Sequence, residues 1–413
     1  MQQFLSSLGR VCAIIGAQWG DEGKGKATDI LAGHFDVIAR ACGGANAGHT
    51  IVVKGRKHVF HLLPSGCLHE GKPVILGAGM VIHLPTLLEE IATLREAGID
   101  ILPRLHISHE AHIIFNYYKA MDAALEERRS RAKGQGIGTT KRGIGPAYTE
   151  KAARSGIRME RLEDDLSQEL QQRAKDAQTL YGVTVESAEE LAALKEAAAL
   201  LADRVSDTVD LIHRYRSEGK TILVEGAQGV LLDIDHGSYP FVTSSSTSSA
   251  GALQALGLPP NALTSCIGIA KAYCTRVGSG TFLTEAPEED AQRLRDRGGE
   301  YGATTGRPRR CGWLHLPDLC RGALTNGFTH WNITKLDVLD EEKEIPIGTG
   351  VDAQGKPVFD YLPGWQASTI GITSFEGLPE NARQYIRYIG EQTGVPVALI
   401  GTGPEREHMI VKN

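Results

Sequence analysis

The chain has 413 residues, a net charge of −6 at pH 7 and an apolar content of 41%. This length suits one large domain with insertions or two domains, and the composition is typical of a globular protein. The negative net charge argues against a general nucleic-acid binder. The sequence has no apolar stretch of membrane-spanning length and no basic flank followed by an apolar run at its start, so we expect a cytoplasmic protein.

The cysteines favour a reducing compartment. They are odd in number and scattered, with no pair at C-x-x-C spacing, so we expect reduced core residues and neither a disulfide framework nor a zinc site. The seven are Cys12, Cys42, Cys67, Cys266, Cys274, Cys311 and Cys320.

A glycine-rich loop at residues 16–26 follows the apolar run 11–15 and precedes a predicted helix at 27–34. Such a turn presents several free backbone N–H groups at one point, which is the geometry that binds phosphate oxygens. The usual phosphate-loop pattern continues with Ser or Thr, but this chain has Ala27. Asp21, inside the loop, is the expected replacement as a Mg²⁺ ligand, and Lys24 or Lys26 can offset phosphate charge.

A second glycine-rich loop follows the predicted strand 36–41 and contains Asn46 and His49. Strand, loop, helix and strand in this order open a parallel α/β sheet. The loops after parallel strands emerge at one edge, so Asp21 and His49 are expected to approach one another. An Asp and a His beside a nucleotide site form a plausible acid–base pair.

The remaining patterns continue an alternation of strands and helices. A loop at 133–148, rich in glycine and positive charge, is expected to close over a phosphate. The other predicted elements are a hairpin at 50–63, strands at 74–82, 105–108, 221–224, 265–277, 328–333 and 395–400, and helices at 85–97, 113–131, within 168–217, and at 379–392.

Two short motifs indicate further ligands. The turn at 301–310 carries Arg307, Arg309 and Arg310, and arginine binds carboxylates and phosphates in a two-pronged manner, so a small carboxylate substrate fits here. Lys335 and Asp337 follow a predicted strand as Lys-x-Asp. Beside a phosphate loop, this pattern favours guanine over adenine, because the Asp accepts from the ring N–H and the exocyclic amine.

These motifs, taken together from Gly16 to Glu405, resemble those of the adenylosuccinate synthetase family. The resemblance implies an α/β fold with a large, mostly parallel central sheet flanked by helices, distantly like the P-loop GTPases, with long ligand-binding loops at the carboxyl edge of the strands. It implies one domain over 1–413 with a mainly helical insertion at about 111–219, a homodimer, and no nucleic-acid or membrane partner.

The implied reaction joins IMP and L-aspartate to give adenylosuccinate, with Mg²⁺ required and GTP cleaved to GDP and phosphate. It runs through a 6-phosphoryl-IMP intermediate and is the first committed step of AMP synthesis from IMP. The resemblance implies that Asp21 removes the N1 proton and contacts Mg²⁺, that His49 stabilises charge on the transferring phosphoryl group, and that Gln228 steadies the intermediate.

The binding residues that the resemblance implies fall into four groups. The GTP site is assigned Gly20, Glu22, Gly23, Lys24, Gly25, Lys26, Lys335, Asp337 and Gly403; the IMP site Asn46, Thr140, Gln228, Thr243 and, from the neighbouring subunit, Arg154; the aspartate site Thr304, Thr305, Arg307 and Arg309; and Mg²⁺ the Asp21 side chain and the Gly48 carbonyl. The chain departs from the family pattern at Ala45, Ser246, Thr281, Leu283, His315 and Gly401.

Two alternative functions stay open at this point. A regulatory GTP-binding switch would share the phosphate loop and the Lys-x-Asp motif, but it would leave the arginine turn and the Asp21/His49 pair unexplained. A variant synthetase that condenses dGMP with aspartate would have a replaced catalytic Asp in the first loop, whereas Asp21 is present here.

Overall fold

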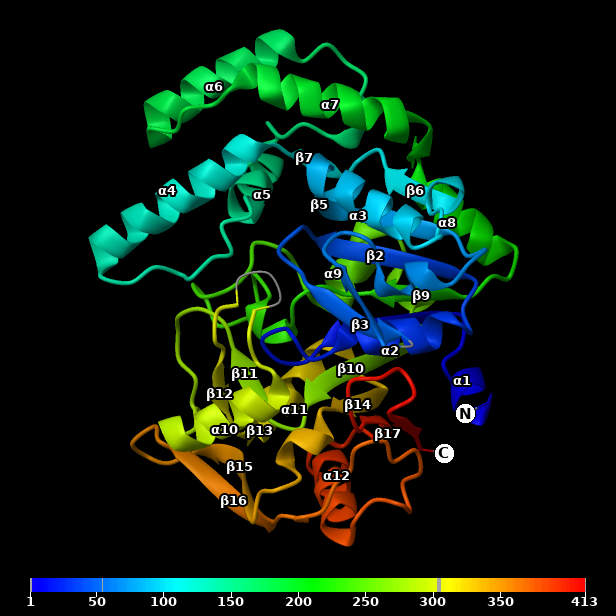
Figure 1. The fold of residues 1–413 in the computed structure, drawn as a ribbon, viewed down its shortest axis with the longest axis vertical. Coiled ribbons are helices and arrows are strands. Elements are labelled where there is room, and N and C mark those ends of the chain that lie inside the picture. Colours follow the sequence, from blue (N-terminus) through cyan, green and yellow to red (C-terminus); the bar gives the residue numbers. More distant parts are fainter. Residues whose placement is uncertain (1, 54, 303–305, 413) are drawn as a thin grey trace.

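The structure is a computed structural model that describes residues 2–53, 55–302 and 306–412. Its centre is a large, mostly parallel sheet flanked by helices, which confirms the predicted fold class (Figure 1). Within the described residues the sheet has eleven strands. Their order is β18 (Met409–Val411), β17 (Val397–Gly401), β14 (His330–Thr334), β10 (Ser265–Lys271), β1 (Val11–Gly16), β9 (Ile222–Glu225), β2 (Val37–Gly43), β5 (Val74–His83), β6 (Leu105–Ser108) and β8 (Val205–Ser206), with β7 (His112–Ile114) also paired to β5.

The middle of this sheet is fully buried. Every residue of β1, β2, β9 and β10 is buried, as expected of parallel strands covered on both faces. β1 pairs in parallel with β10 on one side and β9 on the other, and β9 also pairs with β2. The segments that leave the carboxyl ends of these four strands therefore meet at the centre of one sheet edge, where ligands bind in open α/β folds.

The helices surround the sheet and extend it at one end. α4 to α7 lie together at one end of the molecule, and the β15–β16 hairpin lies at the opposite end (Figure 1). The helices are α1 (Gln2–Ser7), α2 (Lys24–Ala32), α3 (Leu84–Glu96), α4 (Asn116–Lys133), α5 (Ile144–Ala153), α6 (Ser167–Tyr181), α7 (Ser187–Leu201), α8 (Thr208–Ser217), α9 (Ser249–Ala255), α10 (Glu288–Gly298), α11 (Leu316–Asn326) and α12 (Glu380–Thr393).

The helical insertion expected at about 111–219 holds α4 to α8 and also β7 and β8, which pair with strands of the central sheet. This segment is thus fastened to the sheet at both of its ends. Its limits as an insertion stay a prediction.

Three smaller sheets complete the fold among the described residues. β3 (His49–Val53) and β4 (Arg56–Phe60) form the predicted antiparallel hairpin. β11 (Cys274–Arg276) pairs with β12 (Arg310–Gly312), and β13 (Leu314–His315) with β15 (Glu344–Val351), which pairs in turn with β16 (Pro357–Pro363).

Two element predictions are wrong in ways that long-range contacts explain. The single strand expected at 265–277 is divided, because β10 pairs in the central sheet whereas β11 leaves it to pair with β12. The helix expected from residue 113 begins at Asn116, after β7. Its start depends on Glu190 of α7, whose carboxylate accepts the N–H groups of Asn116 and Tyr117 at 3.0 Å each.

Candidate active site

The loop between β1 and α2 encloses a buried acid. The Glu22 carboxylate accepts the backbone N–H groups of Gln18 (3.0 Å) and Gly20 (2.9 Å), and Lys24 Nζ lies 2.7 Å from its other oxygen. Glu22 and Lys24 are 0% and 2% exposed. Gly20 and Gly23 have φ of 84° and 91°, a backbone conformation that glycine adopts without strain. The two predicted GTP ligands Glu22 and Lys24 thus bind each other and tie the loop together.

Gln228, just beyond β9, is pressed against this loop. Lys24 Nζ also donates to the Gln228 carbonyl. If residue 16 carried a Cβ atom, that atom would lie only 2.5 Å from the same carbonyl oxygen, so the two segments are in close contact. The Gln228 side chain accepts a 3.4 Å hydrogen bond from the Ser245 hydroxyl. Its buried Nε2 has no hydrogen-bond partner in the described part of the chain. A buried amide that still has donors to offer is suited to receive a ligand oxygen.

His49 forms a buried dyad with Glu225, the last residue of β9. Its Nδ1 is hydrogen-bonded to one oxygen of Glu225, and the other oxygen accepts the Ser65 N–H at 2.8 Å. Burial lowers the pKa of His49, although Glu225 opposes that effect. Burial also disfavours the Glu225 carboxylate, but His49 beside it holds the pKa of Glu225 below its ordinary value. The pair is therefore a neutral histidine oriented by an ionised glutamate.

Glu225 is not among the residues predicted from the sequence. The available signal was its position, because it is the acid that ends a β-branched strand directly before the Gly226–Gln228 loop. His49 itself lies against the first loop, since a methyl group at Gly25 would lie 3.1 Å from its Cβ. The two loops therefore lie against each other, and the approach of Asp21 to His49 itself stays a prediction.

Asp21 reaches the arginine loop, which we define as residues 299–310. Its carboxylate lies 2.8 Å from Arg309 Nε, with the Asp21 side chain 34% and the Arg309 side chain 11% exposed. Arg307, on the same loop, is exposed, and Arg310 points to Glu285, at 2.6 Å. Thr304 and Thr305, which were predicted to bind aspartate, lie outside the described residues.

The predicted guanine residues gather beyond β14 and β17. Lys26 Nζ donates to the carbonyls of Gly403 (2.8 Å) and His408 (2.7 Å), and burial lowers the pKa of Lys26 to about 8. Burial raises the pKa of Asp337, whose Oδ1 is buried and has no hydrogen-bond partner among the described residues. Lys335 Nζ donates to the Gly298 carbonyl at 2.7 Å.

The residues predicted for IMP are spread along the same edge. Asn46 Oδ1 accepts the Gly44 N–H at 3.2 Å, and the half-buried Thr243 has its hydroxyl 3.5 Å from that of Ser245, the partner of Gln228. Thr140 and Arg154 are exposed, the first in the loop before α5 and the second at the end of α5. Gly48 is half-buried, next to His49.

Backbone strain marks several of these positions. In the described chain, the non-glycine residues with φ in the left-handed region are Asp21, Lys141, Arg154, Gln228, Lys335 and Gln366. Four of the six are predicted site residues. A left-handed backbone costs free energy in a residue with a side chain, so it persists where the surrounding structure or the function requires it.

Two departures from the family pattern have local partners. His315 Nδ1 lies 2.9 Å from the Asp318 carboxylate, one helical turn further along the chain. The Ser246 hydroxyl donates to Asp233 at 3.2 Å. Each of these two side chains thus has an acidic residue beside it.

The chain is similar to known proteins over nearly its whole length. A family model described as adenylosuccinate synthetase matches residues 13–410. The adenylosuccinate synthetase of Zygosaccharomyces rouxii is 45% identical, with 97% of this chain and 99% of that protein covered. The chloroplastic adenylosuccinate synthetase of Ostreococcus tauri is 45% identical, with 98% of this chain and 88% of that protein covered. No helix in the described residues is long and apolar enough to cross a membrane.

Solved structures give the same relationship. The chain superposes on fully ligated adenylosuccinate synthetase from Plasmodium falciparum with a TM-score of 0.94 and 40% identity, over 98% of this chain and 100% of the other. The succinoaminodeoxyadenylate synthetase of cyanophage S-2L, bound to dGMP and dATP, gives a TM-score of 0.62 and 21% identity over 98% of this chain and 95% of the other, a likeness of fold alone. This chain belongs to the adenylosuccinate synthetase family.

Proposed function

We propose how the residues at the sheet edge divide the work of the reaction. As a member of its family, the chain joins IMP and L-aspartate into adenylosuccinate in a GTP-dependent ligation. In our proposal the reaction has two halves. GTP first phosphorylates the O6 atom of IMP, and the aspartate amine then displaces that phosphate at C6.

The main support for these proposed roles is that residues 16–25 contact four distant segments of the chain. Lys24 binds the Gln228 carbonyl, Gly25 packs against His49, Asp21 pairs with Arg309, and the Glu22 carbonyl accepts the Thr334 hydroxyl at 2.6 Å. Residue 335, which follows Thr334, belongs to the predicted guanine pair. A phosphate bound in this loop would thus lie near the Asp21 carboxylate, the His49 ring, the Gln228 amide and the Arg309 guanidinium. A phosphoryl transfer requires groups of this kind around the phosphate.

In the first half, Asp21 acts as the general base on N1 of IMP, which makes O6 a nucleophile. His49 acts on the transferring phosphoryl group. Burial favours the neutral ring, but Glu225 favours the protonated ring, and the negative charge of a γ-phosphate would add to that preference. Protonated His49 then donates from Nε2 toward the phosphoryl oxygens. The unpartnered Gln228 amide donates to the 6-phosphoryl group.

In the second half, the arginine loop binds the aspartate carboxylates through Arg307 and Arg309, together with Thr304 and Thr305. Arg309 is paired with Asp21, which belongs to the first half. A substrate carboxylate that binds the Arg309 guanidinium therefore also changes the surroundings of the base. The aspartate amine attacks C6, the C6–O6 bond breaks, and phosphate leaves.

The GTP site extends from the loop to the guanine residues. Gly23 and Gly25 offer backbone N–H groups to the phosphates, and Lys26 offers its ammonium group. Gly20, whose N–H is bound to Glu22, shapes the loop around them. Asp337 and Lys335 bind the guanine ring, with Gly403 beside them. The buried Oδ1 of Asp337 has no partner in the described chain, so it is an acceptor ready for the guanine N–H donors.

The residues present fit a magnesium ion. Among the described residues, no group of three or more His, Cys, Asp or Glu side chains is arranged to hold a metal. Mg²⁺ does not require such a group, since it commonly binds one or two protein oxygens together with water and phosphate oxygens. The partly exposed Asp21 carboxylate and the Gly48 carbonyl would supply the two protein oxygens. When bound, the ion would neutralise negative charge on the phosphates.

The IMP site is assigned Asn46, Thr140, Gln228 and Thr243, and a homodimer would add Arg154 from the neighbouring subunit. The exposed position of Arg154 at the end of α5 leaves its guanidinium accessible to a second copy of the chain.

The test is phosphate release from GTP and Mg²⁺, with IMP and aspartate omitted in turn and dGMP then used in place of IMP. We expect release only when IMP and aspartate are both present, with adenylosuccinate formed in equal amount. Release with neither substrate would indicate a GTP-binding switch. Activity only when dGMP replaces IMP would indicate the variant synthetase that condenses dGMP with aspartate. Either result would overturn the proposal.

A further inference from the structure

A buried carboxylate that the reaction scheme does not use connects the two substrate pockets. Glu300 lies two residues beyond α10, at the start of the arginine loop, and is 0% exposed. One of its oxygens accepts from Lys335 Nζ at 2.6 Å, and the other accepts from Arg309 NH1 at 2.6 Å. We propose that Glu300 is the positioning residue for both the guanine pocket and the aspartate pocket, an inference that rests on the proposed roles of Lys335 and Arg309.

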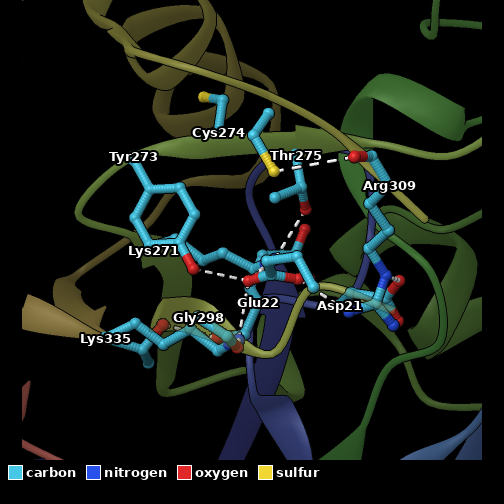
Figure 2. Close-up of polar contacts among 12 residues, drawn as sticks. Asp21, Glu22, Lys271, Tyr273, Cys274, Thr275, Gly298, Arg309 and Lys335 are labelled. Carbon is cyan, nitrogen blue, oxygen red and sulfur yellow. Dashed lines mark hydrogen bonds and ion pairs between the residues drawn. The ribbon is translucent and has the colours of Figure 1, made fainter. Parts of the chain in front are cut away.

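Two further groups fix the Glu300 carboxylate in place. The oxygen that binds Lys335 also accepts from Lys271 Nζ at 2.8 Å and from the Tyr273 hydroxyl at 2.5 Å (Figure 2). Lys271 is 0% exposed and also donates to the Thr275 hydroxyl at 2.6 Å. Burial disfavours the charged acid, but Lys271, Lys335 and Arg309 hold the pKa of Glu300 far below its ordinary value. The carboxylate is therefore ionised and bound from several directions.

The main chain of Glu300 also closes the arginine loop. Its carbonyl accepts the Arg309 N–H at 2.9 Å, and its own N–H donates to the Arg295 carbonyl of α10 at 2.9 Å. The loop thus starts from a residue fastened to α10 and returns to that same residue. Arg309 is held to Glu300 by both main chain and side chain, and its Nε lies 2.8 Å from the Asp21 carboxylate.

Several charges lie close together in this cluster. Its cations are Lys271, Lys335 and Arg309, and its carboxylates are Glu300 and Asp21. Figure 2 shows both Lys271 and Lys335 on the side away from Arg309 and Asp21. Asp337 is a further acid near Lys335, since burial raises its pKa and the charge of Lys335 opposes that rise. A substrate carboxylate beside Arg309 would therefore compete with Asp21 for the guanidinium.

Loss of the Glu300 charge should affect two substrates and spare the third. In Glu300→Gln, Lys335 and Arg309 both lose a charge-assisted hydrogen bond, so KM for GTP and KM for aspartate should each rise about tenfold. KM for IMP should stay within about twofold, because no contact of Glu300 reaches Asn46, Gln228 or Thr243 in the described chain.

Glu342→Gln is the matched control. Glu342 is also buried, 7% exposed, and binds two arginines of α10, Arg293 at 3.3 Å and Arg297 at 2.7 Å. It touches the same helix as Glu300 but lies outside the proposed catalytic and binding residues. If Glu300 were only a structural acid, both variants would lower the melting temperature, and neither would change KM for GTP, aspartate or IMP from the wild-type value. The inference predicts that only Glu300→Gln raises KM, and only for GTP and aspartate.

Glu300→Gln leaves the Lys271 ammonium buried without its counter-ion, so it can fail to fold. The double variant Lys271→Met with Glu300→Gln removes both buried charges, and it should fold and show the same two raised KM values. If KM for GTP or for aspartate is unchanged in the folded variant, the inference is overturned. The proposed function still stands in that case, provided that wild-type turnover needs both IMP and aspartate. A wild type that needs neither IMP nor aspartate overturns both.

Discussion

The first loop with its partners and the arginine loop are organised in opposite ways. In the first, Glu22, Lys24 and Glu225 are at most 2% exposed, and each has charged or backbone partners within hydrogen-bond distance. In the second, Tyr301 is 39% exposed and Arg307 is exposed, and the loop is fastened at its base by Glu300 and Arg309.

This difference follows from what each region has to do. Phosphoryl transfer gains from charges and dipoles that are fixed before the reaction and shielded from water. Those groups extend from buried parallel strands, whose ends cannot shift without disturbing the core. The arginine loop has to admit a small, highly charged amino acid and release its product, a role that suits a surface loop carried by a rigid scaffold.

The largest expected effect is in the first region. Asp21→Asn keeps the shape of the side chain but removes the base, so kcat should fall about 10³-fold. The free energy of unfolding should change by less than about 1 kcal/mol, because Asp21 is one-third exposed and its ion pair is screened. Steady-state phosphate release and thermal unfolding measure the two quantities. A variant with normal kcat would remove Asp21 from the chemistry.

The next effect concerns the nucleotide base. Asp337→Asn replaces an acceptor of two guanine N–H groups with an amide, so kcat/KM for GTP should fall about 100-fold. ITP lacks the exocyclic amine, and the preference for GTP over ITP should therefore shrink in the variant. The two nucleotides are compared in the same assay, and an unaltered ratio would contradict the guanine assignment.

The arginine loop offers a paired test. Arg307→Leu should raise KM for aspartate about 10- to 100-fold and change KM for IMP little, because it removes a bidentate carboxylate partner. Arg310→Leu is the control, since Arg310 lies three residues away and is bound to Glu285 and to the Gly280 carbonyl at 2.8 Å. If the two variants had equal KM values for aspartate, the contrast between the first loop and the arginine loop would be wrong.

The smallest effect is a pH dependence. Burial lowers the pKa of Lys26 from 10.5 to about 8, against the opposing charges of Asp337, Glu407 and Glu405. Lys26 therefore loses its charge above pH 8 in the free enzyme, and kcat/KM for GTP should fall about tenfold for each further pH unit. Lys26→Arg keeps the charge and should move the decline upward in pH. A wild-type profile that stays level to pH 10 would contradict this role.

The sequence was sufficient for most strands of the central sheet and for its first two loops, because local patterns report them, whereas β7, β8 and β18 were not predicted. Apolar runs predicted β1, β5 and β6 within one residue, and glycine-rich segments marked the loops after β1 and β2. The proposed site residues that follow the strands lie at one edge because parallel strands place their carboxyl ends there. The site assignments themselves depend on the family resemblance and stay predictions.

Local sequence patterns did not predict the long-range contacts. The division of the strand at 265–277 depends on β12, more than thirty residues further along. Glu225 and Glu300 gained their importance from His49, Lys335 and Arg309, none of which is a neighbour in sequence. Likewise, no local signal showed that Asp21, Gln228 and Lys335 have left-handed backbones.

The most direct test of the two-half scheme is positional isotope exchange in GTP that carries heavy oxygen in the bridge between its β and γ phosphorus atoms. With IMP present and aspartate omitted, reversible transfer of the γ-phosphoryl group to O6 lets the β-phosphate rotate, and the label moves to a non-bridging position. We predict exchange in the wild type and in Arg307→Leu, and none in Asp21→Asn. Exchange without IMP, or a wild type that exchanges only when aspartate is added, would contradict the account.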